Sequence, residues 1–116
     1  MASRSRPRPR SELLPGTLDL LILQTLSIRS LHGYGIAQQV QRLSDDVLRV
    51  EEGSLYPALQ RLQLKGLIKS RWEKSPTGRR ARYYELTAKG RRQLRAELTS
   101  FERTIAAIRA VLRPAT

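Results

Sequence analysis

The spacing of apolar residues changes twice along this chain, and these two changes restrict the fold more than any other feature. From Pro15 to Gly66 the apolar residues recur mainly at helical intervals. Between Leu67 and Leu86 they lie in two short segments typical of strands, and after Thr87 the helical spacing returns. A chain of 116 residues holds one compact domain with at most an appended element. We therefore expect a mainly α fold with a small β-hairpin.

The first helical segment is apolar on so much of its surface that we expect it to be buried on more than one side. Its stripe comprises Leu14, Leu18, Leu21, Ile22, Thr25 and Leu26. Gly33 and Gly35 are then expected to break the chain before a short second helix, which ends before Ser44. Residues 47–50 have the composition of one short strand.

The third helical segment has a recognisable start and end. Glu51 and Glu52 favour a helix start because acidic groups stabilise the positive end of the helix dipole. Ser54 is expected to cap the helix and Pro57 to lie in its first turn, where proline is tolerated. Its inward residues are Leu55, Ala58, Leu59 and Leu62, and Lys65-Gly66 closes it.

A hairpin and one long helix complete the pattern. Segments 67–74 and 79–86 read as strands joined by the turn Ser75-Pro76-Thr77-Gly78. Thr87 is expected to cap a final helix of about 25 residues. Its apolar residues step by 4, 3, 4, 3 and 4, the spacing of a coiled-coil seam: Leu94, Leu98, Phe101, Ile105, Ile108 and Leu112. This strip favours a homodimer over simple coverage of the first helix, which is the alternative.

Charge is distributed very unevenly. The chain carries 22 Lys and Arg against 10 Asp and Glu, a net charge of +12. Residues 61–95 alone contain twelve basic and two acidic residues. Such a concentration predicts one basic face that binds a polyanion, while a merely solvated surface is the alternative. Residues 1–12 alternate Arg with Ser or Pro and predict a disordered basic arm, which either reaches along DNA or has no role.

The residue inventory argues against catalysis and against a membrane. The chain has no cysteine and a single histidine, His32, so we expect no metal site, no cofactor and no enzyme activity. His32 is expected to pack or to accept a backbone hydrogen bond. No apolar run reaches the roughly 18 to 20 residues that cross a bilayer, which predicts a cytoplasmic protein.

Three short helices followed by a hairpin is the order of a winged helix-turn-helix domain, whose third helix enters the major groove of DNA and whose hairpin is the wing. Hydroxyl, amide and guanidinium groups on such elements pair with base edges and phosphates. The predicted DNA-contact residues are Tyr34, Ser54, Tyr56, Pro57, Gln60, Arg61, Lys65, Lys74, Arg79, Arg80 and Arg82.

Specific motifs add a family resemblance. They are Leu14-Pro15-Gly16-Thr17-Leu18, His32-Gly33-Tyr34-Gly35-Ile36, the run GSLYPALQRL at residues 53–62, Gly66-Leu67-Ile68 and Tyr83-Tyr84-Glu85-Leu86-Thr87. In order and spacing, residues 13–112 resemble the PadR family of bacterial transcriptional regulators. The resemblance implies a repressor-like dimer of the short subgroup with a single C-terminal helix. It divides the chain into the arm, a winged helix-turn-helix domain at 13–87 and a dimerisation helix at 88–113.

The resemblance also implies an inverted-repeat operator, bound as a homodimer. Some PadR-like proteins bind a small aromatic effector between protomers near the last helix, where Phe101 is the only aromatic residue here. The alternative function is a winged-helix module that binds RNA or another protein.

Four side chains have alternative roles. Arg61 is expected to contact a phosphate more readily than a base, or else to be merely solvated. Tyr56 alternatively packs on the second helix. Tyr34 either reaches a phosphate or is buried. Trp72 alternates in phase with Ile68 and is expected to cover the core side of the sheet.

Overall fold

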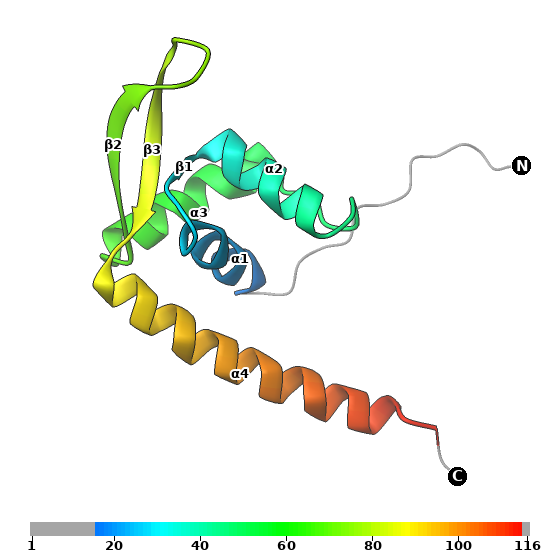
Figure 1. Ribbon diagram of the computed structural model, residues 1–116. Coiled ribbons are helices and arrows are strands. Elements are labelled where there is room, and N and C mark those ends of the chain that lie inside the picture. The colour runs from blue at the N-terminus through cyan, green and yellow to red at the C-terminus, as the bar shows by residue number, and fades with distance from the viewer. Residues whose placement is uncertain (1–15, 115–116) are drawn as a thin grey trace, which may run out of the picture.

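The protein is mainly α-helical, and its small sheet extends away from the helices (Figure 1). The computed structural model describes residues 16–114. The elements are α1 (Thr17–Leu26), β1 (Leu31–His32), α2 (Gly33–Leu43), α3 (Glu52–Leu64), β2 (Ile68–Lys74), β3 (Arg80–Leu86) and α4 (Ala88–Leu112). The predicted order of three helices, a hairpin and a long helix is confirmed. Leu14 and the predicted arm at 1–12 lie outside the described residues.

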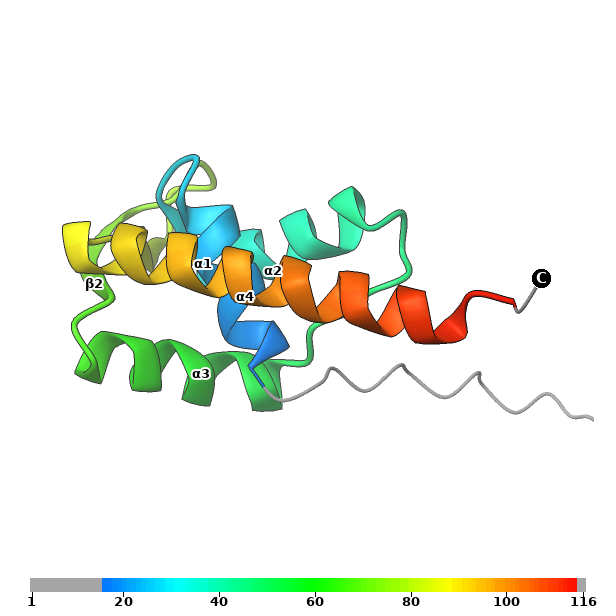
Figure 2. The ribbon, with the colours of Figure 1, turned by 90° about the horizontal axis from the view of Figure 1, so that it is seen from below.

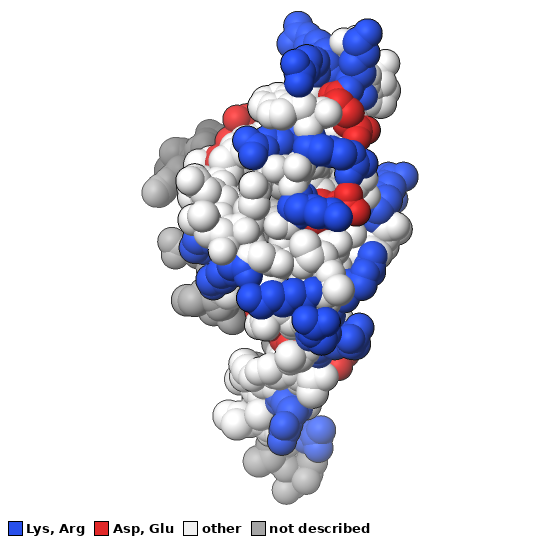
Figure 3. All heavy atoms as spheres, turned by 90° about the vertical axis from the view of Figure 1, so that its left-hand side faces the viewer, with Lys and Arg blue, Asp and Glu red and all other residues white. Residues whose placement is uncertain are grey.

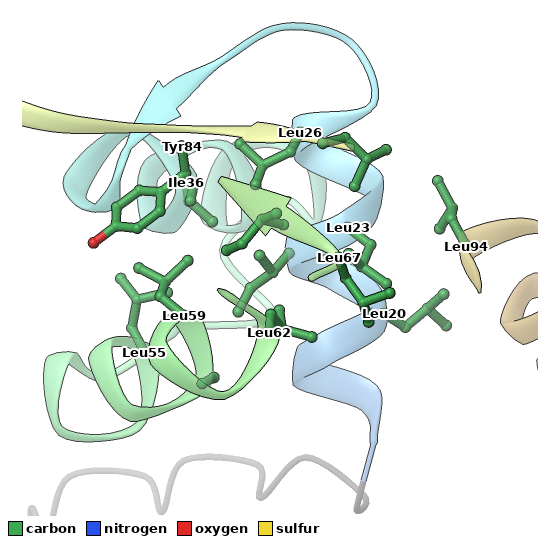
Figure 4. Close-up of a cluster of buried hydrophobic side chains, with 14 residues drawn as sticks. Leu20, Leu23, Leu26, Ile36, Leu55, Leu59, Leu62, Leu67, Tyr84 and Leu94 are labelled. Carbon is green, nitrogen blue, oxygen red and sulfur yellow. The ribbon is translucent and has the colours of Figure 1, made fainter. Parts of the chain in front are cut away.

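Helix α1 is the centre of the core. It contacts α2, α3, α4 and strand β3, and seen from below it lies between α2 and α3 (Figure 2). Ile22 and Leu23 are completely buried. Figure 4 shows Leu62 of α3 and Leu67, just before β2, close to Leu23. The prediction that α1 is buried on more than one side is therefore confirmed.

The start of α2 differs from expectation. Gly33 and Gly35 do not break the chain but form the first turn of α2, and both are buried. His32 caps this helix because its Nδ1 accepts a hydrogen bond from Gly35 N at 2.9 Å, as expected for a packed histidine. The two residues before α2 form β1, which pairs with β3, so the sheet has the order β1-β3-β2.

The strand expected at residues 47–50 is wrong. This segment is an irregular loop, in which Leu48 N donates to Ser44 Oγ at 2.9 Å. Asp45 and Asp46 adopt left-handed backbone conformations with φ of 57° and 68°. These conformations belong to the turn that precedes residues 47–50, and β1 instead occupies the free edge of β3.

Helix α3 begins earlier than predicted, which corrects two expectations. Its N-cap is Glu51, whose carbonyl accepts from the backbone N–H groups of Ser54 and Leu55. Ser54 therefore lies inside the helix and does not cap it. Pro57 is the sixth residue of α3 and lies in the second turn, not the first. The carbonyl that its missing N–H would have met belongs to Gly53, which is exposed to solvent.

The hairpin extends past the core, and this explains the position of Trp72. The turn forms as predicted, with Gly78 N donating to Ser75 O and Gly78 at a φ of 88°. Trp72 shares its sheet face with the buried Ile68, but it is 56% exposed because the strands continue beyond the helices. The expectation that Trp72 covers the core is therefore wrong. Tyr83 and Tyr84 lie on opposite faces of the sheet, with Tyr84 buried.

Helix α4 starts against the wing and then leaves the domain. Thr87 caps it as predicted, accepting from Gly90 N at 3.0 Å. Leu94 is buried in the core of the protomer and Leu98 packs against that core. Beyond these residues α4 extends away from the other elements (Figures 1 and 2).

Substituting Gly90 with alanine is expected to destabilise the fold strongly. A Cβ at Gly90 would lie 2.0 Å from the carbonyl oxygen of Leu67, so the backbone itself would have to move. We expect a loss of about 3 kcal/mol in the free energy of unfolding, measured by urea and thermal denaturation. The matched control is Gly53→Ala, because a Cβ at Gly53 meets nothing within 4 Å. That variant should be unchanged or gain up to about 1 kcal/mol. Equal unfolding midpoints for Gly90→Ala and the wild type would contradict this packing.

Candidate nucleic-acid interface

The tip of the wing is a cluster of exposed cations. Lys74, Arg79, Arg80 and Arg82 are all exposed, and none forms an ion pair with any residue between 16 and 114. Figure 3 shows Lys and Arg side chains gathered at this tip. Register places Lys74 directly opposite Arg80, a like-charged pair that disfavours the hairpin. An anion between these cations would remove that penalty.

Arg71 lies on the same hairpin but differs from the wing-tip cations because it forms ion pairs. Its guanidinium donates to Glu73 and Glu85, and these contacts raise the pKa of Arg71 above its ordinary value. It lies on the sheet face opposite to Trp72 and Arg82. The acidic residues of the hairpin therefore neutralise its outer face and leave its tip positive.

The polar face of α3 is exposed, as a recognition helix requires. Ser54, Tyr56, Pro57, Gln60 and Lys65 all face solvent. The apolar residues of the same helix are buried in the core (Figure 4): Leu55, Ala58, Leu59 and Leu62. The predicted separation of an inward and an outward face is thus present, and the structure brings these five predicted residues together on the outward side or at the helix end.

Arg61 is tied to the core helix. Its Nη2 lies 2.7 Å from Oδ1 of Asp19 on α1, with side-chain exposures of 52% and 17%. This ion pair links α3 to α1. Because the guanidinium is half exposed, it still has donors available to a phosphate.

Two tyrosines lie where α2 meets α3. Tyr34 is 67% exposed, so its predicted alternative as a buried residue is wrong. Tyr56 is 46% exposed, yet its ring also packs on the backbone of Gly33, where a Cβ would lie 2.8 Å from the Tyr56 hydroxyl oxygen. Tyr56 therefore both packs on α2 and presents its ring to solvent.

A groove of about 570 Å³ runs between these tyrosines and the inner face of the hairpin. Trp72, Arg80 and Arg82 form the hairpin side of it, and Tyr84 also lines it. Burial raises the pKa of the Tyr84 phenol above its ordinary value, with a smaller opposing effect from Arg82. The phenol is consequently protonated at neutral pH and is a hydrogen-bond donor.

Sequence reasoning did not identify Trp72 and Tyr84 as members of a site. The sequence does contain information that places Trp72 beside a cation, because the predicted turn fixes the register in which Trp72 lies opposite Arg82. No local pattern reveals the groove itself, since its walls come from α2, α3 and the hairpin.

The predicted dimerisation residues separate into two groups. Leu94 and Leu98 pack within the protomer. The remaining residues of the seam lie beyond the core, where Phe101 is 38%, Ile108 42% and Leu112 74% exposed, and Ile105 is half-buried. Val111 beside them is 83% exposed. The free end of α4 therefore presents apolar side chains that the described part of this protomer does not cover.

The arrangement of an exposed polar helix beside a basic wing is that of winged helix-turn-helix DNA-binding proteins. Residues 22–96 match the Transcriptional regulator PadR-like family, and the chain belongs to this family of transcriptional regulators. The chain is similar to a PadR family transcription regulator from Clostridium difficile, with 32% identity and a TM-score of 0.74 over 84% of this chain and 100% of that one.

The chain is similar to two further proteins. A transcriptional regulator from Clostridium thermocellum is 28% identical and superimposes with a TM-score of 0.77, over 84% of this chain and 92% of that one. An uncharacterised protein of Lysinibacillus sphaericus is 29% identical over 85 residues, which are 73% of this chain and 78% of the relative. Among residues 16–114, no helix is both long and apolar enough to span a membrane.

The contact between Gly33 and Tyr56 is expected to appear as an energetic coupling. Gly33→Ala places a methyl group against the Tyr56 ring and should lower the free energy of unfolding by about 1 to 3 kcal/mol. The three atoms nearest to that methyl group all belong to Tyr56, so the same substitution in a Tyr56→Ala background should cost much less. Urea denaturation of the four proteins gives the coupling energy. Additive effects would show that Tyr56 does not rest on Gly33 in solution.

Proposed function

We propose that this PadR-family regulator is a repressor that binds an inverted-repeat operator as a homodimer, with one α3 and one wing in each half-site. The observation that carries this proposal is the exposed cationic wing tip beside the exposed polar face of α3. Phosphates bound by arginine and lysine supply most of the affinity of DNA-binding proteins. Side chains on a helix in the major groove supply sequence discrimination.

The side chains of α3 divide by chemistry. Ser54, Tyr56 and Gln60 carry hydroxyl and amide groups suited to base edges, and Pro57 offers an apolar surface for close approach. Arg61 and Lys65 are suited to phosphates, as are the four wing-tip cations. In the dimer, the two α3 helices would lie about 34 Å apart, which matches half-sites one DNA turn apart.

The uncovered end of α4 supports the dimer. An apolar stripe of this length in water is unfavourable, and an identical stripe across a two-fold axis covers it by self-complementary packing. Thr104 and Ala107 are small enough for the two helices to approach closely. A small aromatic effector that releases the repressor belongs to this proposal, and Phe101 is the aromatic residue of α4 that would meet it.

The test of the proposal is binding to the DNA just upstream of the gene for this protein. Fluorescence anisotropy at fixed salt should show tight binding of this DNA that random duplex DNA and RNA displace poorly. Equal displacement by RNA would overturn operator recognition and favour the RNA-binding alternative.

Substitutions in the wing and in α3 are expected to change binding in different ways. Arg79→Ala with Arg80→Ala should weaken binding to operator and random DNA alike. The salt slope, which is the steepness with which the logarithm of the binding constant falls with the logarithm of the salt concentration, should decrease by about one unit per lost phosphate contact. Tyr56→Ala or Gln60→Ala should instead cost about 1 to 3 kcal/mol at one base pair and shrink the ratio of specific to random binding. Arg103→Ala, in the free part of α4, is the charge control.

Circular dichroism of each variant must first show a folded protein, because Tyr56 also packs on Gly33. An unchanged salt slope for the wing variant would mean that its arginines are only solvated. If both α3 variants keep the wild-type ratio of specific to random DNA binding, α3 does not discriminate between base sequences.

Disrupting the free end of α4 is expected to give a folded monomer. Ile108→Asp with Leu112→Asp places two charges in the proposed dimer interface, which should raise the dimer dissociation constant by at least about 100-fold. Both residues are exposed in the protomer, so its own fold should survive. Ala110→Asp is the control, because helical geometry places residue 110 on the opposite side of α4. Sedimentation of the wild type as a monomer at tens of micromolar would contradict the dimer.

A further inference from the structure

The groove between the two helices α2 and α3 and the wing brings aromatic rings, cations and a buried hydroxyl together in one place. Its exposed walls are aromatic, with Trp72 on the hairpin and Tyr34 and Tyr56 on the helices. Its charged groups are Arg79, Arg80 and Arg82, and no acidic residue between 16 and 114 lines it. Flat apolar surfaces beside several cations form a site for a planar ring that carries negative charge.

The floor of the groove holds a polar group without a partner. Tyr84 is 8% exposed, and in the described part of the chain its hydroxyl forms no hydrogen bond. Figure 4 shows the hydroxyl directed away from the apolar cluster on which the ring packs. Because buried polar groups usually have a partner, this donor points to a ligand acceptor in the groove.

The cations of the groove are already arranged around the indole. The guanidinium carbons of Arg80 and Arg82 lie 5.6 and 5.8 Å from the centre of the Trp72 ring. Arg82 is further held by its Nε, which donates to Ser70 Oγ at 2.9 Å. A phosphate bound by these arginines would therefore lie beside a ring on which a base can stack.

We propose that this groove binds a free nucleotide, with its base stacked between Trp72 and Tyr56 and its phosphates held by Arg79, Arg80 and Arg82. The Tyr84 hydroxyl donates to an acceptor on the base or the sugar. Three arginines, with no carboxylate from the described part of the chain beside them, fit the multiple charge of a nucleoside polyphosphate better than the single charge of an aromatic acid.

The same position makes the nucleotide a regulator of DNA binding. Tyr84 is buried while Tyr56 and Trp72 at the rim are exposed, so a duplex resting on α3 and the wing tip meets the rim and a small ligand reaches the floor. Both would use the wing arginines, so nucleotide and DNA exclude each other. This regulatory role rests on the proposed DNA-binding function, whereas the nucleotide site itself does not.

The chain contains one tryptophan, so the fluorescence of Trp72 reports directly on the groove. The protein without DNA is titrated with ATP and with GTP, and in separate arms with adenosine and with inorganic pyrophosphate. We expect saturable quenching by at least one nucleotide, and at least tenfold weaker binding of adenosine and pyrophosphate. Calorimetric titration of the same nucleotide provides a dissociation constant that is independent of Trp72.

Three variants assign the binding to the groove. Arg80→Gln should weaken nucleotide binding at least tenfold, and Tyr84→Phe should weaken it measurably because only the unpartnered hydroxyl is removed. Arg92→Gln on α4 removes an exposed arginine outside the groove and should leave the dissociation constant unchanged. No saturable binding of either nucleotide, or equal binding by all three variants, would overturn the proposal.

A competition experiment separates this proposal from the DNA-binding function. The upstream DNA is bound to the protein and the nucleotide is added at ten times its dissociation constant, which should weaken DNA binding about tenfold. Unchanged DNA affinity despite nucleotide binding would overturn the regulatory role. If the protein binds nucleotide but no upstream DNA, the operator proposal fails and the nucleotide site stands.

Discussion

The junction between the wing and α4 rests on one close backbone contact. Gly90 lies so near the Leu67 carbonyl that any side chain at residue 90 would collide with it. Thr87 N also donates to that carbonyl at 3.1 Å, and Lys89 Nζ donates to the carbonyl of Lys65, the C-cap of α3, at 2.9 Å. The end of α3, the start of β2 and the start of α4 are thus fixed to one another. In the proposed dimer, this junction sets the spacing of the two recognition helices, because it joins the DNA-binding elements rigidly to the dimerisation helix.

The hairpin extends beyond the core, and this extension lowers its stability. Its base is held by buried residues such as Ile68 and Leu86, but its tip leaves the core and places like charges on facing strands. The turn backbone and the Trp72 ring, with two arginines near it, are what support this tip. Cations here cost the folded protein some stability in the absence of an anion. That cost is consistent with a surface selected for binding and not for packing.

Much of the fold could be predicted from the sequence because its elements are local and strongly periodic. The apolar stripes of α1 and α3, the turn ending in Gly78 and the Thr87 cap each depend on residues a few positions apart. Strand β1 could not be found in this way, because two residues carry no periodic signal and pair only with a strand about fifty residues away. Likewise, alternation correctly gave the face of Trp72 but not its exposure, which depends on how far the helices extend beneath the sheet.

The same distinction between local patterns and long-range packing applies to the predicted site. The exposed face of α3 follows from the pattern of its buried face, whereas the Arg61–Asp19 ion pair depends on how α3 packs against α1. An exposed pair of this kind contributes about 0 to 1 kcal/mol, so a phosphate can recruit Arg61 at little cost. Asp19 nevertheless has only 17% of its side chain exposed and stays close to α3. An uncompensated carboxylate beside a phosphate would repel it, and Arg61 therefore acts best by bridging the two. In the proposed complex, Arg61 thus contacts the DNA backbone, and sequence discrimination falls to Tyr56 and Gln60 on the exposed face of α3.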